Sequence, residues 1–104
     1  MILRRRFTDL ITRQLDLFDE ENAELISDCV AAERAYDGAP REGAEERYGD
    51  YLDLVETGTE ILAGMRDHYA RESLDGDASA EYERAFNRGA AKRFPRFALE
   101  LEDT

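Results

Sequence analysis

Apolar residues recur once per helical turn along two long stretches of this chain. Residues 7–36 contain neither glycine nor proline, and steps of three, four and seven separate their apolar side chains. The apolar side chains of residues 44–73 recur with the same steps. The spacing matches the period of an α-helix, and no strand-like alternation by two competes with it. We therefore predict an all-α fold.

Turn-forming residues divide the chain into three predicted helices at 7–36, 44–73 and 80–94. Gly38 suits the left-handed position after a helix, and Pro40 cannot continue one. In the second turn, at residues 74–79, Asp77 or Ser79 is the expected N-cap of the third helix. Pro95 should end that helix and leave residues 95–104 as a tail with Phe97, Leu99 and Leu101. At 104 residues, the chain should be one domain, residues 1–104.

If the first helix is interrupted, the interruption should lie near Asp19–Asn22. The apolar spacing slips there, and polar Asn22 falls on the apolar side of the helix. We expect one long helix that bends at this point.

The apolar stripes give the candidate core. Their side chains should lie either inside the domain or in an interface with another chain, because one stripe per helix is all that a helix pair can bury. Tyr36 and Tyr48 flank the first loop and are expected to close that end of the helix pair. The predicted core or interface residues are Phe7, Leu10, Ile11, Leu17, Phe18, Leu25, Cys29, Tyr36, Tyr48, Leu52, Val55, Leu62, Met65, Tyr69, Tyr82 and Phe86.

The predicted architecture is a long antiparallel helical hairpin with a shorter third helix laid against it. A 30-residue helix is about 45 Å long, and a third helix of about 15 residues cannot cover such a hairpin. The uncovered surface should be apolar, which on a protein of this kind marks an interaction surface. A two-fold homodimer is the commonest way to bury it, so we expect dimerisation to complete a helical bundle.

The charge of the chain restricts its partners. The net charge is −11, from 25 acidic and 14 basic residues, and it should repel nucleic acid and anionic membranes alike. The only cysteine, Cys29, cannot form an internal disulfide, which favours a cytoplasmic location. No apolar run is long enough to span a membrane, so the expected partner is a second copy of the chain or another protein.

Residues with catalytic or metal-binding chemistry are few. His68 is the only histidine, and Met65 stands where the Glu-x-x-His motif of di-iron bundles needs glutamate. His68 with Glu72, or Glu56 with Glu60, could hold a surface ion, but acidic pairs one turn apart are unavoidable at this glutamate content. Cys29 falls in an apolar stripe and is expected to act as a small buried hydrophobe. We therefore predict no enzyme activity, catalytic residues, metal or cofactor.

The most unusual feature is a cationic strip near the end of the third helix. Arg84, Arg88 and Lys92 stand four residues apart, Arg93 and Arg96 adjoin them, and no acid occurs from residue 87 to residue 99. The strip could dock an acidic partner, a phosphate or a nucleic acid. It could also complement the helix dipole and pair with acids of the first two helices, such as Glu20, Glu24, Glu33, Glu56 and Glu60.

Three functional hypotheses follow from the sequence. The first is an interaction or structural module that works by helix packing and homo-oligomerisation. The second is a small-molecule-binding or metal-binding helical bundle, with or without enzyme activity. The third is a regulator that docks an acidic partner or nucleic acid through residues 84–96.

Overall fold

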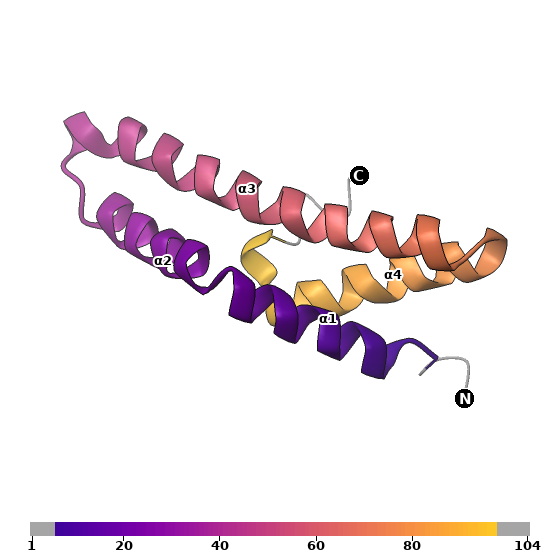
Figure 1. The fold of residues 1–104 in the computed structure, drawn as a ribbon. Helices are drawn as coiled ribbons and strands as arrows, with labels where there is room; N and C mark the ends of the chain where they lie inside the picture. Colours follow the sequence, from indigo (N-terminus) through magenta and orange to yellow (C-terminus); the bar gives the residue numbers. More distant parts are fainter. Residues whose placement is uncertain (1–5, 98–104) are drawn as a thin grey trace.

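The computed structural model describes residues 6–97, and these residues are helical with no strand, which confirms the all-α prediction over this range. Four helices follow in order: α1 (Thr8–Glu21), α2 (Ala23–Asp37), α3 (Arg41–Ser73) and α4 (Gly76–Arg93). One further helical turn occupies residues 95–97. The helices α2 and α3 run side by side, α4 returns along α3, and α1 packs on α4 (Figure 1).

The first predicted helix is two helices, α1 and α2, because the helical conformation is interrupted at Asn22. Asn22 has φ −120° and ψ 26°, outside helical geometry. Both its backbone N–H and its side-chain Nδ2 donate to the carbonyl oxygen of Phe18, at 2.9 and 3.0 Å. The side chain thus competes with the helical hydrogen-bond pattern, as asparagine often does. The expectation of one long, bent helix was wrong, although the break falls inside the segment Asp19–Asn22.

The turns also differ in detail from the prediction. Gly38 has φ −93° and ψ 0°, so it does not adopt the left-handed conformation expected there. Gly76 adopts the left-handed conformation, with φ 50°, which residues other than glycine adopt at a cost in free energy. The helix α4 begins at this glycine, after Asp75, and neither Asp77 nor Ser79 is its N-cap residue.

The molecule is elongated, with extents of 52 × 24 × 23 Å and a radius of gyration of 15.7 Å. A compact chain of this length would have a radius of about 13 Å. The extra length comes from α2 and the first half of α3, which project as a two-helix arm, defined here as residues 23–57 (Figure 1).

The core lies where α1, the second half of α3, α4 and the turn 95–97 meet. Its largest fully buried side chains are aromatic, and several make edge-to-face contacts that favour this packing. Phe18, for example, contacts Phe94 and Phe97 with ring centroids 5.1 and 5.9 Å apart. Tyr82 contacts Phe7 at 5.5 Å and Tyr69 at 4.9 Å. In contrast, the arm buries only Cys29 and Val55 completely.

Candidate functional site

The structure divides the predicted cationic strip into two groups. Arg93 and Arg96 turn toward the protein and pair with acids of α1 and α2. The side chains of Arg84, Arg88 and Lys92 are exposed along one ridge of α4. Within residues 6–97, the structure shows no ion pair for these three. Two residues at the end of the strip, Arg93 and Arg96, therefore pair within the chain as the intramolecular interpretation expects.

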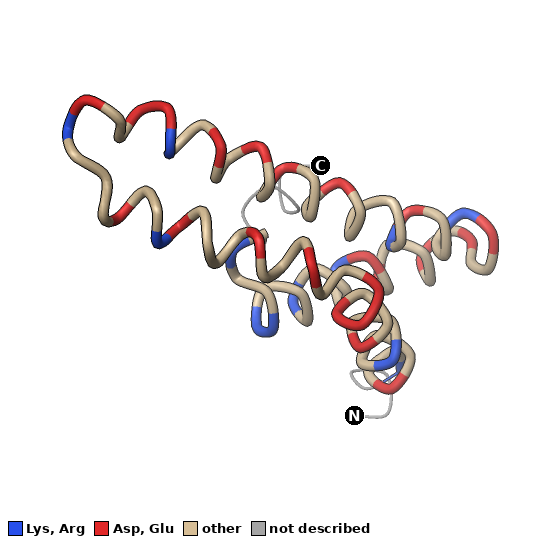
Figure 2. The backbone as a smooth tube through the Cα atoms, turned by 60° about the vertical axis from the view of Figure 1, so that its left-hand side comes forward, with Lys and Arg blue, Asp and Glu red and all other residues tan. Residues whose placement is uncertain are grey.

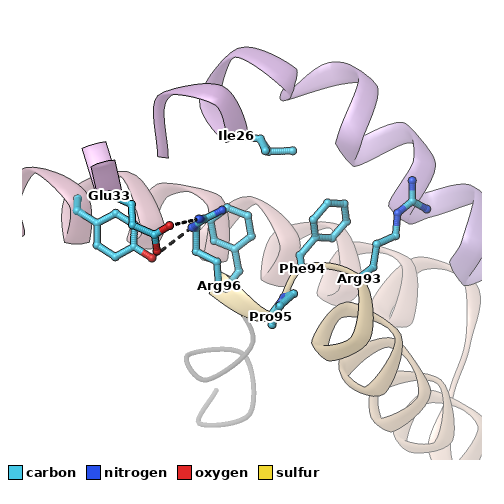
Figure 3. A pocket seen from close by; sticks show the side chains of 8 residues that line it. Ile26, Glu33, Arg93, Phe94, Pro95 and Arg96 are labelled. Carbon is cyan, nitrogen blue, oxygen red and sulfur yellow. Dashed lines mark hydrogen bonds and ion pairs between the residues drawn. The ribbon is translucent and has the colours of Figure 1, made fainter. Parts of the chain in front are cut away.

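Arg96 joins the turn after α4 to both helices of the arm. Its Nη2 donates to Glu33 Oε1 at 3.1 Å, and its Nε donates to the Tyr51 hydroxyl at 3.2 Å (Figure 3). Burial lowers the pKa of Arg96, but the hydrogen bond to Tyr51 and the attraction of Glu33 outweigh it, so the pKa is raised. Ile26 and Phe97 also line this cavity of about 550 Å³. The half-buried cation of this cavity, Arg96, is thus already paired with Glu33.

Arg93 holds the end of α4 against α1. Its guanidinium donates to Asp16 and to Asp19, the second contact being 3.4 Å long, and it also lies over the Phe94 ring at 5.4 Å. The hydrogen bond to Asp16 is the main reason why the pKa of Arg93 is raised. The predicted partners among the acids of the first two helices thus include Glu33, while Asp16 and Asp19 were missed.

A groove of about 400 Å³ runs between α1 and α4. Its floor is apolar, formed by Ile11, Leu15, Ala85 and Gly89, and its polar lining is made of two threonines and three cations. Gly89 brings the helices together, because a Cβ added there would lie 3.1 Å from Ile11 Cγ2. The cations and threonines in the lining are Thr8, Thr12, Arg88, Lys92 and Arg93, and no acid of residues 6–97 lines the groove.

Three leucines, one on each of α1, α2 and α3, keep part of their side chains at the surface. At about 100° per residue, Leu52 lies about 60° from buried Val55, on the side opposite Tyr51, which contacts Arg96. By the same geometry Leu25 and Ile26 lie on either side of buried Cys29 on α2, and Leu17 lies about 200° around α1 from buried Leu15. Leu17 and Leu52 are 47% and 43% exposed, and Leu25 is half-buried. We call Leu17, Leu25 and Leu52 the leucine face.

The other predicted core or interface residues separate by burial. Leu10, Met65 and Tyr69 are half-buried against the core. Tyr36 and Tyr48 stay exposed, although their rings pack together at the end of the arm with centroids 5.1 Å apart. The predicted residues that are buried are Phe7, Ile11, Phe18, Cys29, Val55, Leu62, Tyr82 and Phe86.

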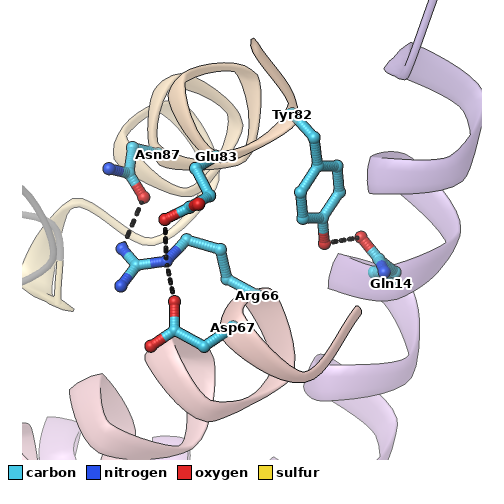
Figure 4. A network of polar contacts seen from close by, with 6 residues as sticks. All are labelled: Gln14, Arg66, Asp67, Tyr82, Glu83 and Asn87. Carbon is cyan, nitrogen blue, oxygen red and sulfur yellow. Dashed lines mark hydrogen bonds and ion pairs between the residues drawn. The ribbon is translucent and has the colours of Figure 1, made fainter. Parts of the chain in front are cut away.

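Arg66 is a buried charge that the sequence pattern did not reveal. It lies between α3 and α4, where its guanidinium donates to Asp67 at 2.8 Å and to Asn87 at 3.0 Å and lies 3.9 Å from Glu83 (Figure 4). The signal was its position four residues after Leu62, on the buried ridge of α3. Because its partners come from its own helix and from α4, Arg66 fixes the packing of those helices.

The residues considered for catalysis or metal binding do not come together. His68 and Glu72 are exposed on α3, as are Glu56 and Glu60. Cys29 is buried, and burial raises the pKa of its thiol, which disfavours the reactive thiolate. Within residues 6–97, no group of three or more His, Cys, Asp or Glu side chains is arranged to hold a metal.

Helices long and apolar enough to cross a bilayer are absent from residues 6–97. Comparison with protein-family models, with curated proteins and with solved structures found no match.

Proposed function

We propose that this chain is a helical interaction module that works by pairing with a second copy through its arm and leucine face. It uses no catalytic residue, metal or cofactor. The observation that carries this proposal is the exposure of two leucines, Leu17 and Leu52, on a structure whose aromatic core is otherwise well buried. Exposed leucines in a common face are costly in water and typical of a surface that another protein covers.

The thin arm supports the same proposal. Two helices can bury one seam, and here the seam consists of Cys29 and Val55 with Tyr36 and Tyr48 at its end. A second copy against the arm would add helices to it and complete a helical bundle from the antiparallel pair α2 and α3. A cytoplasmic setting belongs to the proposal, because Cys29 has no partner for an internal disulfide.

Sedimentation velocity at micromolar concentration tests the proposal. We expect the wild-type chain to sediment as a dimer and Leu52→Glu to shift it toward monomer, since a carboxylate would be placed in the buried contact. Thr57→Glu is the matched control, because it adds the same charge to an exposed position of α3 far around the helix from Leu52. A wild-type chain that is monomeric throughout would overturn the proposal.

A further inference from the structure

The groove between α1 and α4 has the chemistry of a docking site for an acidic amphipathic helix. Its apolar floor would bury leucine-sized side chains, and Arg88 and Lys92 on its rim would face carboxylates. Arg84 extends the cations one turn further along α4. A bare phosphate would gain nothing from the floor contributed by Ile11 and Leu15. The combination favours a helix that carries leucine and acids together.

The arm of the same protein carries such a surface. It contains ten acidic and three basic residues, which lie along both of its helices (Figure 2). Beside Leu52 on α3 lie Glu45, seven residues before it, and Glu56, four residues after it. Asp28 stands in the same relation to Leu25 on α2, three residues further along. The leucines of the arm are therefore fringed by carboxylates.

Charge decides which surface of a second copy the arm can meet. Two leucine faces placed directly against each other would bring Glu45, Glu56 and Asp28 of both copies together, and like charges across an interface oppose association. The groove presents the opposite charge around an apolar floor of its own, and the part of its lining that the structure describes contains no acid. It is therefore the better match for the arm.

We propose that the arm of one copy docks in the α1–α4 groove of a second copy, with Leu25 and Leu52 over the floor and Glu45 and Glu56 facing Arg88 and Lys92. This inference rests on the proposed function and specifies its interface. Arm and groove lie toward opposite ends of a molecule 52 Å long (Figure 1). Used twice about a two-fold axis, the contact closes a dimer and leaves neither surface open.

Charge reversal of the groove tests this contact. The double variant Arg88→Glu/Lys92→Glu should raise the dimer dissociation constant by about tenfold or more, because it replaces attraction with repulsion. Arg6→Glu/Arg71→Glu makes the same charge change at exposed positions outside both the arm and the groove and should leave association unchanged. Circular dichroism verifies that both double variants keep their helices.

A charge swap provides the decisive measurement. Glu45→Lys/Glu56→Lys should weaken self-association in the same way, and mixing it with Arg88→Glu/Lys92→Glu should yield a heterodimer by sedimentation. In that mixture one contact pairs reversed charges with reversed charges. The control Glu46→Lys/Asp50→Lys, on the opposite side of α3 from Leu52, should give no such rescue.

The outcomes separate this inference from the proposed function. A wild-type dimer that Leu52→Glu disrupts, but that is indifferent to charge at Arg88 and Lys92, would overturn the groove contact and leave the proposed function standing. Absence of the heterodimer would also overturn the contact. The groove would then bind another acidic segment or remain empty. A monomeric wild-type chain would overturn both.

Discussion

The ring of Phe97 lies directly on the backbone of Gly58. A Cβ added to Gly58 would sit 2.4 Å from Cε1 of that ring. This is closer than two non-bonded carbons approach, so the ring or the helix would have to shift. Phe97 is fully buried, and its backbone carbonyl accepts a hydrogen bond from the Thr59 hydroxyl at 3.3 Å. The glycine therefore creates the site into which the turn after α4 fits.

Gly58→Ala is expected to destabilise the protein by about 1–3 kcal/mol, the usual cost of overpacking a core. The clash should exceed the gain of about 1 kcal/mol that alanine brings to a helix interior. Gly64→Ala is the matched control, because nothing lies within 4 Å of its added Cβ. That variant should gain up to about 1 kcal/mol. Urea unfolding measures both, and equal effects of the two substitutions would contradict the packing described.

Tyr82 should make stability fall at alkaline pH. Burial raises its pKa from 10.0 to about 12. The folded state thus holds this proton more tightly than the unfolded state. Its contribution is complete below pH 10 and is lost as pH rises toward 12. Urea unfolding on both sides of pH 10 should show a steeper loss for wild type than for Tyr82→Phe.

The same substitution has an effect near neutral pH. The Tyr82 hydroxyl donates to Gln14 Oε1 at 2.8 Å, so Tyr82→Phe should cost about 1 kcal/mol there. Tyr36→Phe, at an exposed ring, should leave both the stability and its alkaline slope close to those of wild type. If Tyr82→Phe keeps the wild-type slope, the tyrosine does not control that loss.

Arg96 should resist replacement by lysine. Its planar guanidinium contacts Glu33, Tyr51 and the Tyr51 ring face together, and an ammonium group cannot reproduce that geometry. Because the Glu33 side chain is 46% exposed, solvent screens the pair, and we expect Arg96→Lys to cost about 1 kcal/mol. A double-mutant cycle with Glu33→Gln measures the coupling, and a coupling of zero would show that the ion pair adds nothing.

The contacts of Arg93 should depend on salt. Its side chain is 35% exposed and those of Asp16 and Asp19 about half, so Asp16→Asn/Asp19→Asn should cost no more than about 1 kcal/mol at low ionic strength. In 1 M salt the cost should largely disappear, because screening acts over about 3 Å there. Glu20→Gln, at an exposed position of α1, serves as the control. A cost that persists in high salt would indicate a packing effect.

Periodicity predicted the all-α class because it reports directly on which side of a helix is buried, but it joined α1 and α2 into one helix. It could not place Phe97, which was expected in a tail. The burial of Phe97 depends on Gly58, 39 residues earlier, and no local pattern records that contact. The rest of that tail, with Leu99 and Leu101, and the basic residues Arg4 and Arg5 lie outside the described residues.

Charged residues were harder to predict than apolar ones. The spacing of Arg84, Arg88 and Lys92 fixed their common ridge, because helix geometry alone decides it. Which cations would pair inside the chain depended on the return of α4 to α1 and on the turn after α4, which placed Arg93 beside Asp16 and Arg96 beside Glu33. Arg66 was missed for the same reason, since its partners Asn87 and Glu83 come from α4.

The arm joins the rest of the molecule at the helix break of Asn22 and along α3, and it buries only Cys29 and Val55 completely. Regions with so few buried contacts open at a low free energy, without global unfolding. Amide hydrogens of the arm should therefore exchange with solvent sooner than those of the aromatic core. Since the proposed contact lies on this same segment, a docked partner would slow that exchange. Its affinity would be reduced by the free energy needed to suppress local opening of the arm.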